Sequence, residues 1–342
     1  MFDLDRKPVW SAHLIYKGWQ LATPACIPGS GTFNITECAL PSAARRSGLA
    51  LSNHTKADIL LVITTLLAGG GWIMSKESLA GFSPLLFISS RFALAGLLLL
   101  SVNAAALTRL TYEQWKGSLL VGLFFGCGMV FWILGLQLAT HIGVGAFLVS
   151  LGVVLVPLLG VFFGDRPGRY VYYSLPCVVG GLACLSLDSG FDIGLGELCF
   201  LASAVFLALM FIANSKASSK TPTGPLTTIQ LLVTGAITLL VSAFFEQWQI
   251  PDEWNIWGWF MASVLIGTVL RFSIQTRAQG MAPISHAAII MTLEPVWAAL
   301  MAAAWLGDSM SALQMAGCGL IFLAMLVNRW PAVRAWYKTA RA

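Results

Sequence analysis

The feature that most constrains this chain is a regular series of long apolar segments that begins at Asp58. Short breaks rich in Pro, Gly, Ser and Asp separate them, such as Ser83-Pro84 and Gly307-Asp308. Each segment is long enough to cross a bilayer as an α-helix, which takes about 20 residues. The expected spans are 58–76, 85–103, 116–137, 141–163, 169–187, 195–215, 226–245, 256–277, 283–306 and 311–329.

The composition excludes the soluble classes of protein. Of the 342 residues, 57% are apolar and only 10% are charged, whereas a soluble domain carries about 25% charged residues. The mean hydropathy of +0.79 points the same way. A soluble enzyme, a disordered protein and a secreted disulfide module are therefore excluded, and the lipid bilayer is the expected partner. No nucleic-acid partner is expected, because a net charge of +5 reports membrane sidedness in such a chain.

The Lys and Arg residues indicate how the spans are oriented. With the N-terminus in the cytoplasm, 18 of the 20 Lys and Arg fall in inside segments, Arg271 and Arg277 among them. Lys76 then lies outside, and Arg91 lies well within a span. This distribution follows the positive-inside rule, and an even number of spans leaves both termini inside. We predict an all-α integral membrane protein with ten transmembrane helices and both termini cytoplasmic, located as a multi-pass protein in the bacterial inner (plasma) membrane.

Two halves of the chain are weakly similar to each other. A shift of 143 residues lays 139–165 over 282–308, and a shift of 140 lays Ser75-Lys76 over Ser215-Lys216. Five spans separate the paired segments, so the halves are expected to have inverted orientations, as in many secondary transporters. The predicted organisation is a polar N-terminal extension, two inverted five-helix repeats and a basic cytoplasmic tail, at 1–57, 58–188, 195–329 and 330–342.

The N-terminal extension differs from the rest of the chain. It is polar, rich in Pro, Gly and Ser, and contains no apolar run that would serve as a signal peptide or a span. Two interpretations stay open: a flexible tail, or a translation start assigned upstream of the native one near Ser52.

Several short motifs resemble a known family. Gly71-Trp72-Ile73-Met74-Ser75-Lys76 closes the first span, and Ser83-Pro84-Leu85-Leu86-Phe87 leads into Arg91-Phe92. Pro157 and Gly164-Asp165-Arg166 mark the fourth span, and Leu293-Glu294-Pro295-Val296 with Leu306-Gly307-Asp308 marks the ninth. In order and spacing these residues resemble the EamA-type transporters of the drug/metabolite transporter superfamily over about 58–329. Asp165 and Asp308 stand where that family more often has Glu.

The resemblance implies a function and a place for the site. It implies secondary transport of a small organic metabolite by alternating access, with export of amino acids or related metabolites as the commonest activity. It also implies a cavity lined mainly by spans one to four and six to nine.

Three ionisable residues inside the predicted spans are candidates for function. Arg91 lies about 9 Å along the helix from Leu85, and an intramembrane charge is a functional hypothesis by default. The alternative is that Arg91 snorkels outward or pairs with Glu77. Glu294, before Pro295, is a candidate for proton, ion or substrate binding, or for a structural hinge. His286, two turns earlier on roughly the same face, is a candidate to share a proton with Glu294, or a packing histidine.

Other polar and aromatic side chains fall on the spans expected to line the cavity. As substrate-binding or gating candidates they join Arg91, and they are Trp72, Trp132, Gln137, Ser150, Gln275 and Thr292. The alternative for each Trp is an interface anchor. The glycines at 69–71 more simply allow close helix contact.

Some kinds of chemistry have no motif in the chain. The sequence holds no phosphate-binding loop, no Cys or His spacing typical of a metal site, and no paired catalytic groups. We therefore expect no cofactor, no metal and no enzymatic activity. A membrane scaffold or regulatory protein that retains the transporter fold is the alternative function. Monomer and homodimer both stay open.

Overall fold

A computed structural model of the chain describes residues 53–138, 142–186, 194–306 and 311–339, and these form helices and no strand. Seven helical stretches are long and apolar enough to cross a membrane, and Leu148–Phe163 and Met315–Asn328 are shorter apolar stretches. The prediction of an all-α, multi-pass membrane protein is therefore confirmed. The seven stretches are Thr55–Ser78, Pro84–Leu107, Tyr112–Leu138, Leu195–Ser218, Thr223–Phe245, Trp254–Gln279 and Ile284–Trp305.

Helical structure is present over each of the ten predicted segments. Seven of these segments lie on one helix each, and the fourth, eighth and ninth are divided. The elements are α1 (Asn53–Ser78), α2 (Pro84–Leu107), α3 (Tyr112–Leu138), α4 (Ile142–Gly160), η2 (Val161–Phe163), α5 (Arg169–Ser186), α6 (Leu195–Ser218), α7 (Thr223–Phe245), α8 (Trp254–Val264), η3 (Leu265–Leu270), α9 (Arg271–Gln279), α10 (Ile284–Met291), α11 (Leu293–Leu306) and α12 (Ala312–Thr339).

Helix ends are fixed by carboxylates from distant segments. Pro84 occupies the first turn of α2, and Glu246 accepts hydrogen bonds from the backbone N–H of Leu85 (3.0 Å) and Leu86 (2.8 Å). Asp165 accepts hydrogen bonds from the side chain and the backbone N–H of Ser285 at the start of α10. An acid suits a helix N-terminus because free N–H groups and the positive end of the helix dipole meet there.

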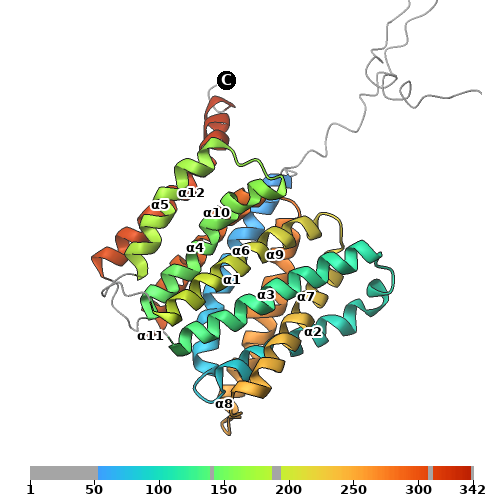
Figure 1. The fold of residues 1–342 in the computed structure, drawn as a ribbon. Helices are drawn as coiled ribbons and strands as arrows, with labels where there is room; N and C mark the ends of the chain where they lie inside the picture. Colours follow the sequence, from blue (N-terminus) through green and yellow to red (C-terminus); the bar gives the residue numbers. More distant parts are fainter. Residues whose placement is uncertain (1–52, 139–141, 187–193, 307–310, 340–342) are drawn as a thin grey trace, which may run out of the picture. The chain divides into compact units, whose positions relative to one another are not determined.

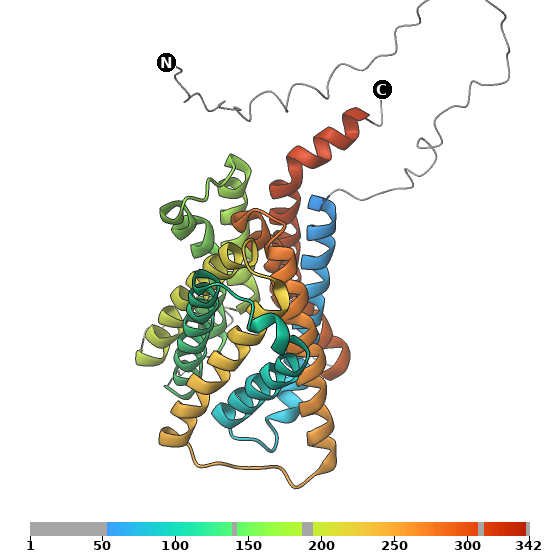
Figure 2. The same ribbon diagram turned by 90° about the vertical axis from the view of Figure 1, so that its right-hand side faces the viewer.

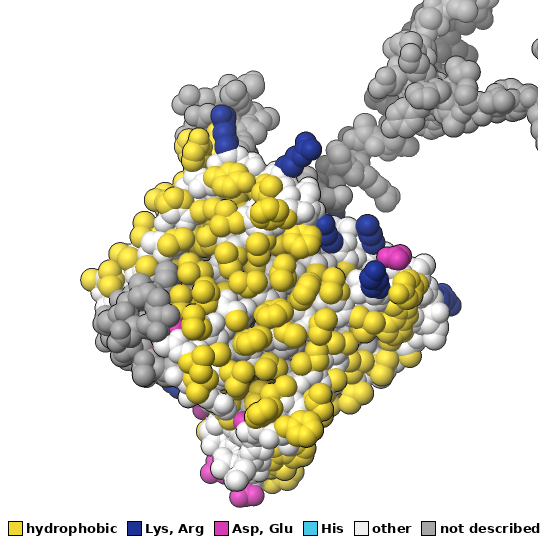
Figure 3. Space-filling view, in the orientation of Figure 1, with side chains coloured by type: hydrophobic (Ala, Val, Ile, Leu, Met, Phe, Trp, Pro, Cys, Tyr) yellow, Lys and Arg dark blue, Asp and Glu magenta, His cyan; other side chains and the backbone are white. Residues whose placement is uncertain are grey.

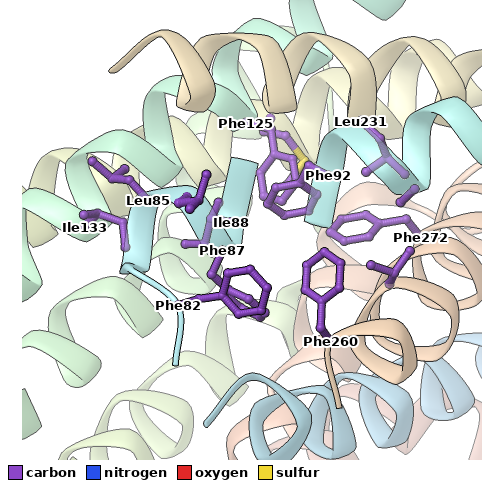
Figure 4. Packing of buried hydrophobic residues seen from close by; sticks show 14 of the residues in the cluster. Phe82, Leu85, Phe87, Ile88, Phe92, Phe125, Ile133, Leu231, Phe260 and Phe272 are labelled. Carbon is purple, nitrogen blue, oxygen red and sulfur yellow. The ribbon is translucent and has the colours of Figure 1, made fainter. Parts of the chain in front are cut away.

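Helices from the two halves of the chain pack against each other. The most extensive contacts join α2 to α7, α3 to α6, and α5 to α12 (Figures 1 and 2). Around α2, phenylalanines from four elements interlock in one buried cluster (Figure 4). Its ring contacts include Phe92 with Phe125 (5.2 Å between centroids) and Phe125 with Phe272 (5.2 Å). These packed helices form the frame on which the polar residues are placed.

The surface separates apolar side chains from charged ones. One face is covered by a broad apolar band, with Lys and Arg along its upper margin and Asp and Glu mostly at the lower end near α8 (Figure 3). An apolar band between charged margins is the surface expected where lipid surrounds a protein.

Of the three divided spans, the eighth and the ninth are irregular away from their ends. The eighth contains a π-helical segment, η3, between α8 and α9. The ninth is interrupted at Thr292, between α10 and α11. Pro295 contributes to this break because it has no backbone N–H to donate to the carbonyl of Met291. Both irregular segments lie beside charged residues, and π-helical segments often accompany functional sites.

Candidate functional site

An ion pair lies inside the membrane-length helices. Arg271, the first residue of α9, places Nη2 2.9 Å from Oε2 of Glu294 on α11, and the side chains are 17% and 25% exposed. Glu294 is ten residues after the start of α10 and twelve before the end of α11, so the pair lies well within the Ile284–Trp305 span. Charged groups at this depth are costly unless they are paired or hydrated.

Arg91 connects three helices next to this ion pair. Its Nε donates to Thr268 Oγ1 (2.6 Å), its Nη1 to Ser75 Oγ (2.8 Å) and its Nη2 to the carbonyl of Gly267 (3.3 Å). The guanidinium lies 5.5 Å from the ring centroid of Phe92, within cation–π range. Arg91 therefore ties α2 to α1 and to the π-helical segment η3.

Two tryptophans complete this group. The indole N–H of Trp72 donates to Glu294 Oε1 (3.3 Å), and the Trp72 and Trp132 rings meet edge to face with centroids 6.2 Å apart. Trp72 is 50% exposed, so about half of its surface is not covered by other parts of the protein. Trp72, Arg91, Trp132, Arg271 and Glu294 are called the central cluster below.

A second polar group lies at the start of α1. Nε2 of His286 on α10 is 2.9 Å from Oδ1 of Asp58, and its Nδ1 is 3.0 Å from Nδ2 of Asn328 on α12. Because Asn328 donates to Nδ1, the ring proton belongs on Nε2, which donates to Asp58. Asp58, His286 and Asn328 are called the end cluster.

The remaining candidates lie outside both clusters. Gln137 is exposed at the end of α3, and Ser150 is half-buried on α4. Gln275 is buried on α9, one turn after Arg271. Thr292 is buried and returns its hydroxyl to the carbonyl of Ile289 (2.6 Å), which is consistent with a role in the helix break.

The contacts bear on the interpretation of three residues. Arg271 was assigned to the cytoplasmic edge, but it lies inside the Trp254–Gln279 span and pairs with Glu294. Arg91 contacts Ser75, Thr268 and Gly267 rather than Glu77. Of the two interpretations of His286, the contacts favour a packing histidine, because its ring bonds Asp58 and Asn328, Glu294 pairs with Arg271, and the break at Thr292 lies between His286 and Glu294.

Sequence reasoning also missed several residues of the site. Asp58, Asn328, Ser75 and Thr268 were not singled out, although the predicted topology places the starts of the first and ninth spans on one side of the membrane. No group of three or more Cys, His, Asp or Glu suited to a metal occurs within the described residues.

Comparison with known proteins shows which family the sequence matches. The sequence profile described as "EamA-like transporter family" matches residues 55–187 and again 194–330. An "Uncharacterized transporter" of Archaeoglobus fulgidus is 26% identical over 277 residues, covering 79% of this chain and 85% of that protein. "Uncharacterized transporter YvbV" of Bacillus subtilis is 28% identical over 210 residues, covering 59% of this chain and 67% of that protein.

A solved structure shares the fold. A chain titled "Crystal structure of protein" superposes with a TM-score of 0.69 at 20% identity, over 82% of this chain and 99% of that one. The two matched stretches of the family profile together cover most of the sequence. This chain belongs to the EamA-like transporter family.

Proposed function

We propose that this protein is a secondary transporter that exports a small organic metabolite, such as an amino acid, across the bacterial inner membrane by alternating access. The observation that carries the proposal is the central cluster, in which charged and aromatic side chains meet within apolar, membrane-length helices. Such groups inside a membrane protein mark substrate or ion pathways.

The architecture supports the proposal. We propose ten crossings in two inverted five-helix repeats, 58–188 and 195–329, with both termini cytoplasmic. The pairing of α2 with α7 and of α5 with α12 is what a two-fold relation between such repeats would bring together. Interrupted helices beside a site deep in the membrane are also typical of secondary transporters.

Individual residues take separate roles in this proposal. Arg91 stabilises the outward gate, because it joins α1, α2 and η3. Glu294 tunes the substrate or ion site through its pair with Arg271. Glu294 and His286 are the candidates for proton or ion coupling. Trp72 and Trp132 contribute an apolar wall, and Gln137, Ser150, Gln275 and Thr292 are further candidates for lining the path.

Flux in proteoliposomes tests the proposal. The full chain is reconstituted, and pooled amino acids and metabolites are screened with and without an imposed pH gradient. We expect uptake of one solute class, reduced about tenfold or more in Arg91→Gln and in Glu294→Gln. Arg277→Gln is the matched control, because Arg277 is exposed on the same helix as Arg271.

The outcomes separate the alternatives. Enhancement of flux by the gradient, lost in His286→Gln or Glu294→Gln, identifies the coupling residue, whereas gradient-independent flux assigns both to structure. Unchanged flux in Arg91→Gln and Glu294→Gln at normal expression contradicts their roles. No flux with any pool contradicts transport and favours a scaffold that retains the fold.

A further inference from the structure

We infer that the central cluster binds its solute through a carboxylate, and that an organic monoanion fits it better than the matching amino acid or amine. The inference rests on the proposed function and narrows the class of substrate. It comes from the charge balance and unused hydrogen-bond donors of the cluster.

The central cluster carries more positive than negative charge. Arg91 and Arg271 are both cationic, and Glu294 is the single acid of the cluster. Arg91 bonds Gly267 and Thr268 in the segment that directly precedes Arg271. Excess charge among apolar helices is costly without a counter-ion. One carboxylate in the solute would balance the three side chains, whereas a zwitterion would leave the excess and an amine would add to it.

The hydrogen bonds of Arg91 are all to uncharged oxygens. The Ser75 hydroxyl already donates to the Gly71 carbonyl (2.6 Å), and that of Thr268 to the Ser263 carbonyl (2.9 Å). Each hydroxyl has one proton to give, so both present lone pairs to Arg91. The contacts of Arg91 within the described segments therefore include hydroxyls, a carbonyl and aromatic rings, and no acid.

Arg271 has N–H groups that Glu294 does not bond. Glu294 engages Nη2 alone, and the buried Nε has no hydrogen-bond partner among the described residues. A guanidinium offers five N–H donors in a planar fork that suits a carboxylate. A solute carboxylate can thus bind Arg271 beside Glu294 or replace Glu294, which retains the Trp72 indole as a partner.

The tryptophans indicate where the rest of the solute lies. Trp72 contacts both Glu294 and Trp132 and is half exposed. An apolar group attached to the carboxylate would cover that exposed ring. The structure therefore favours a small acid with an apolar body over a small polar anion.

Two series of matched solutes test the inference. One is 4-methylpentanoate, leucine and 3-methylbutylamine, and the other is 3-phenylpropionate, phenylalanine and 2-phenylethylamine. Binding to the purified full chain is measured by the rise in its unfolding midpoint with solute concentration, since a ligand that binds the folded state stabilises it. In at least one series we expect the acid to bind most tightly, the amino acid at least tenfold more weakly, and the amine not at all.

Substitutions distinguish solute binding from a structural ion pair. We expect Arg271→Gln to lose at least tenfold in affinity for the acid, and Glu294→Gln to match or exceed the wild type because Arg271 is released. Turnover in Glu294→Gln still falls, because release slows. The double variant Arg271→Gln/Glu294→Gln keeps a neutral pair for folding and is expected to fold without binding, while Arg277→Gln binds normally.

Three results would overturn the inference. The first is that either amine binds as tightly as its acid, and the second is that Arg271→Gln and Glu294→Gln lose acid binding equally. The third is that a transported solute carries no anionic group. Each of these leaves transport itself standing. The proposed function fails separately, through absence of flux with every pool.

Discussion

The central cluster and the end cluster differ in the charges that they bring together. In the end cluster both ring nitrogens of His286 have partners, from helices at opposite ends of the sequence. In the central cluster Arg271 keeps a buried donor without a partner among the described residues, and two cations accompany a single acid, which pairs with Arg271. Exposure does not separate them, since Arg271 and His286 are 17% and 18% exposed.

This difference teaches what each group is suited to do. A ligand site needs polar groups that can contact the ligand. The central cluster has such groups, because it holds an unused hydrogen-bond donor and an excess positive charge. The hydrogen bonds that join α1, α10 and α12 through His286 are suited to hold helix ends together. We therefore expect the central cluster to determine affinity and the end cluster to determine how readily the helices move.

The largest effect is expected from Gly69→Leu, which would disturb both clusters at once. A Cβ at Gly69 would lie 2.7 Å from Trp297 Cβ and 3.0 Å from the backbone nitrogen of Ala298. Since α1 carries Asp58 near one end and Trp72 near the other, displacing it from α11 shifts both sites. We expect little folded protein by size-exclusion chromatography in detergent.

Smaller substitutions make this prediction quantitative. Gly69→Ala is expected to cost about 1–3 kcal/mol of stability by overpacking, seen as a lower unfolding midpoint. Gly70→Ala is the matched control, because a Cβ there meets only Met301 Sδ at 3.8 Å. Equal midpoints for the two Ala variants would show that α1 tolerates movement against α11.

The second effect concerns the hydroxyls that hold Arg91. Thr268→Val and Ser75→Ala each remove one hydrogen bond to the guanidinium. A hydrogen bond to a charged group is worth about 1.5–3 kcal/mol, so we expect each variant to lose about tenfold in solute affinity, and the double variant about a hundredfold. The measurement is solute titration of the unfolding midpoint.

A control on α1 separates the hydroxyls at the site from hydroxyls in general. Thr64→Val removes a buried hydroxyl that bonds only within its own helix, to the carbonyl of Leu60, so affinity is expected to stay within about twofold of wild type, well under the 1.4 kcal/mol that a tenfold change requires. A loss in Thr64→Val as large as in Thr268→Val would contradict a specific role for the Arg91 contacts.

The third effect is expected in turnover rather than in binding. His286→Ala removes the link between Asp58 and Asn328. We expect flux to fall about tenfold, which corresponds to about 1.4 kcal/mol, while solute affinity stays the same. His286→Gln offers an amide that can bond both partners and is expected to lie closer to wild type. A parallel loss of affinity in His286→Ala would show that the two clusters are not separate in function.

The sequence predicted the parts of the site that depend on chemistry within one span. Arg91 and Glu294 were found because charges are rare in apolar segments. Arg271 was missed because it lies near the C-terminal end of the 256–277 segment, where a basic residue is expected to mark the inner membrane face. Its position inside the Trp254–Gln279 span becomes evident only when its partner on α11 is known.

Contacts between helices were beyond the reach of sequence patterns. The π-helical segment η3 changes the number of residues per turn, so a regular helical pattern would not place Thr268 and Gly267 toward Arg91. The alternative in which His286 shares a proton with Glu294 assumed one continuous helix. The break at Thr292 lies between the two residues, and each takes partners from other helices instead.

The smallest effect tests the Trp72 indole in the central cluster. Trp72→Phe keeps an aromatic ring for Trp132 but removes the hydrogen bond to Glu294. That bond is long at 3.3 Å and its donor ring is half exposed, so its loss should cost near the lower end of about 0.5–1.5 kcal/mol. We expect acid affinity to fall about threefold, because Glu294 displaced from Arg271 would no longer have the indole as a partner. Trp254→Phe is the control, because Trp254 is 88% exposed at the start of α8. A loss of tenfold or more in Trp72→Phe would instead make the indole N–H itself a direct donor to the solute.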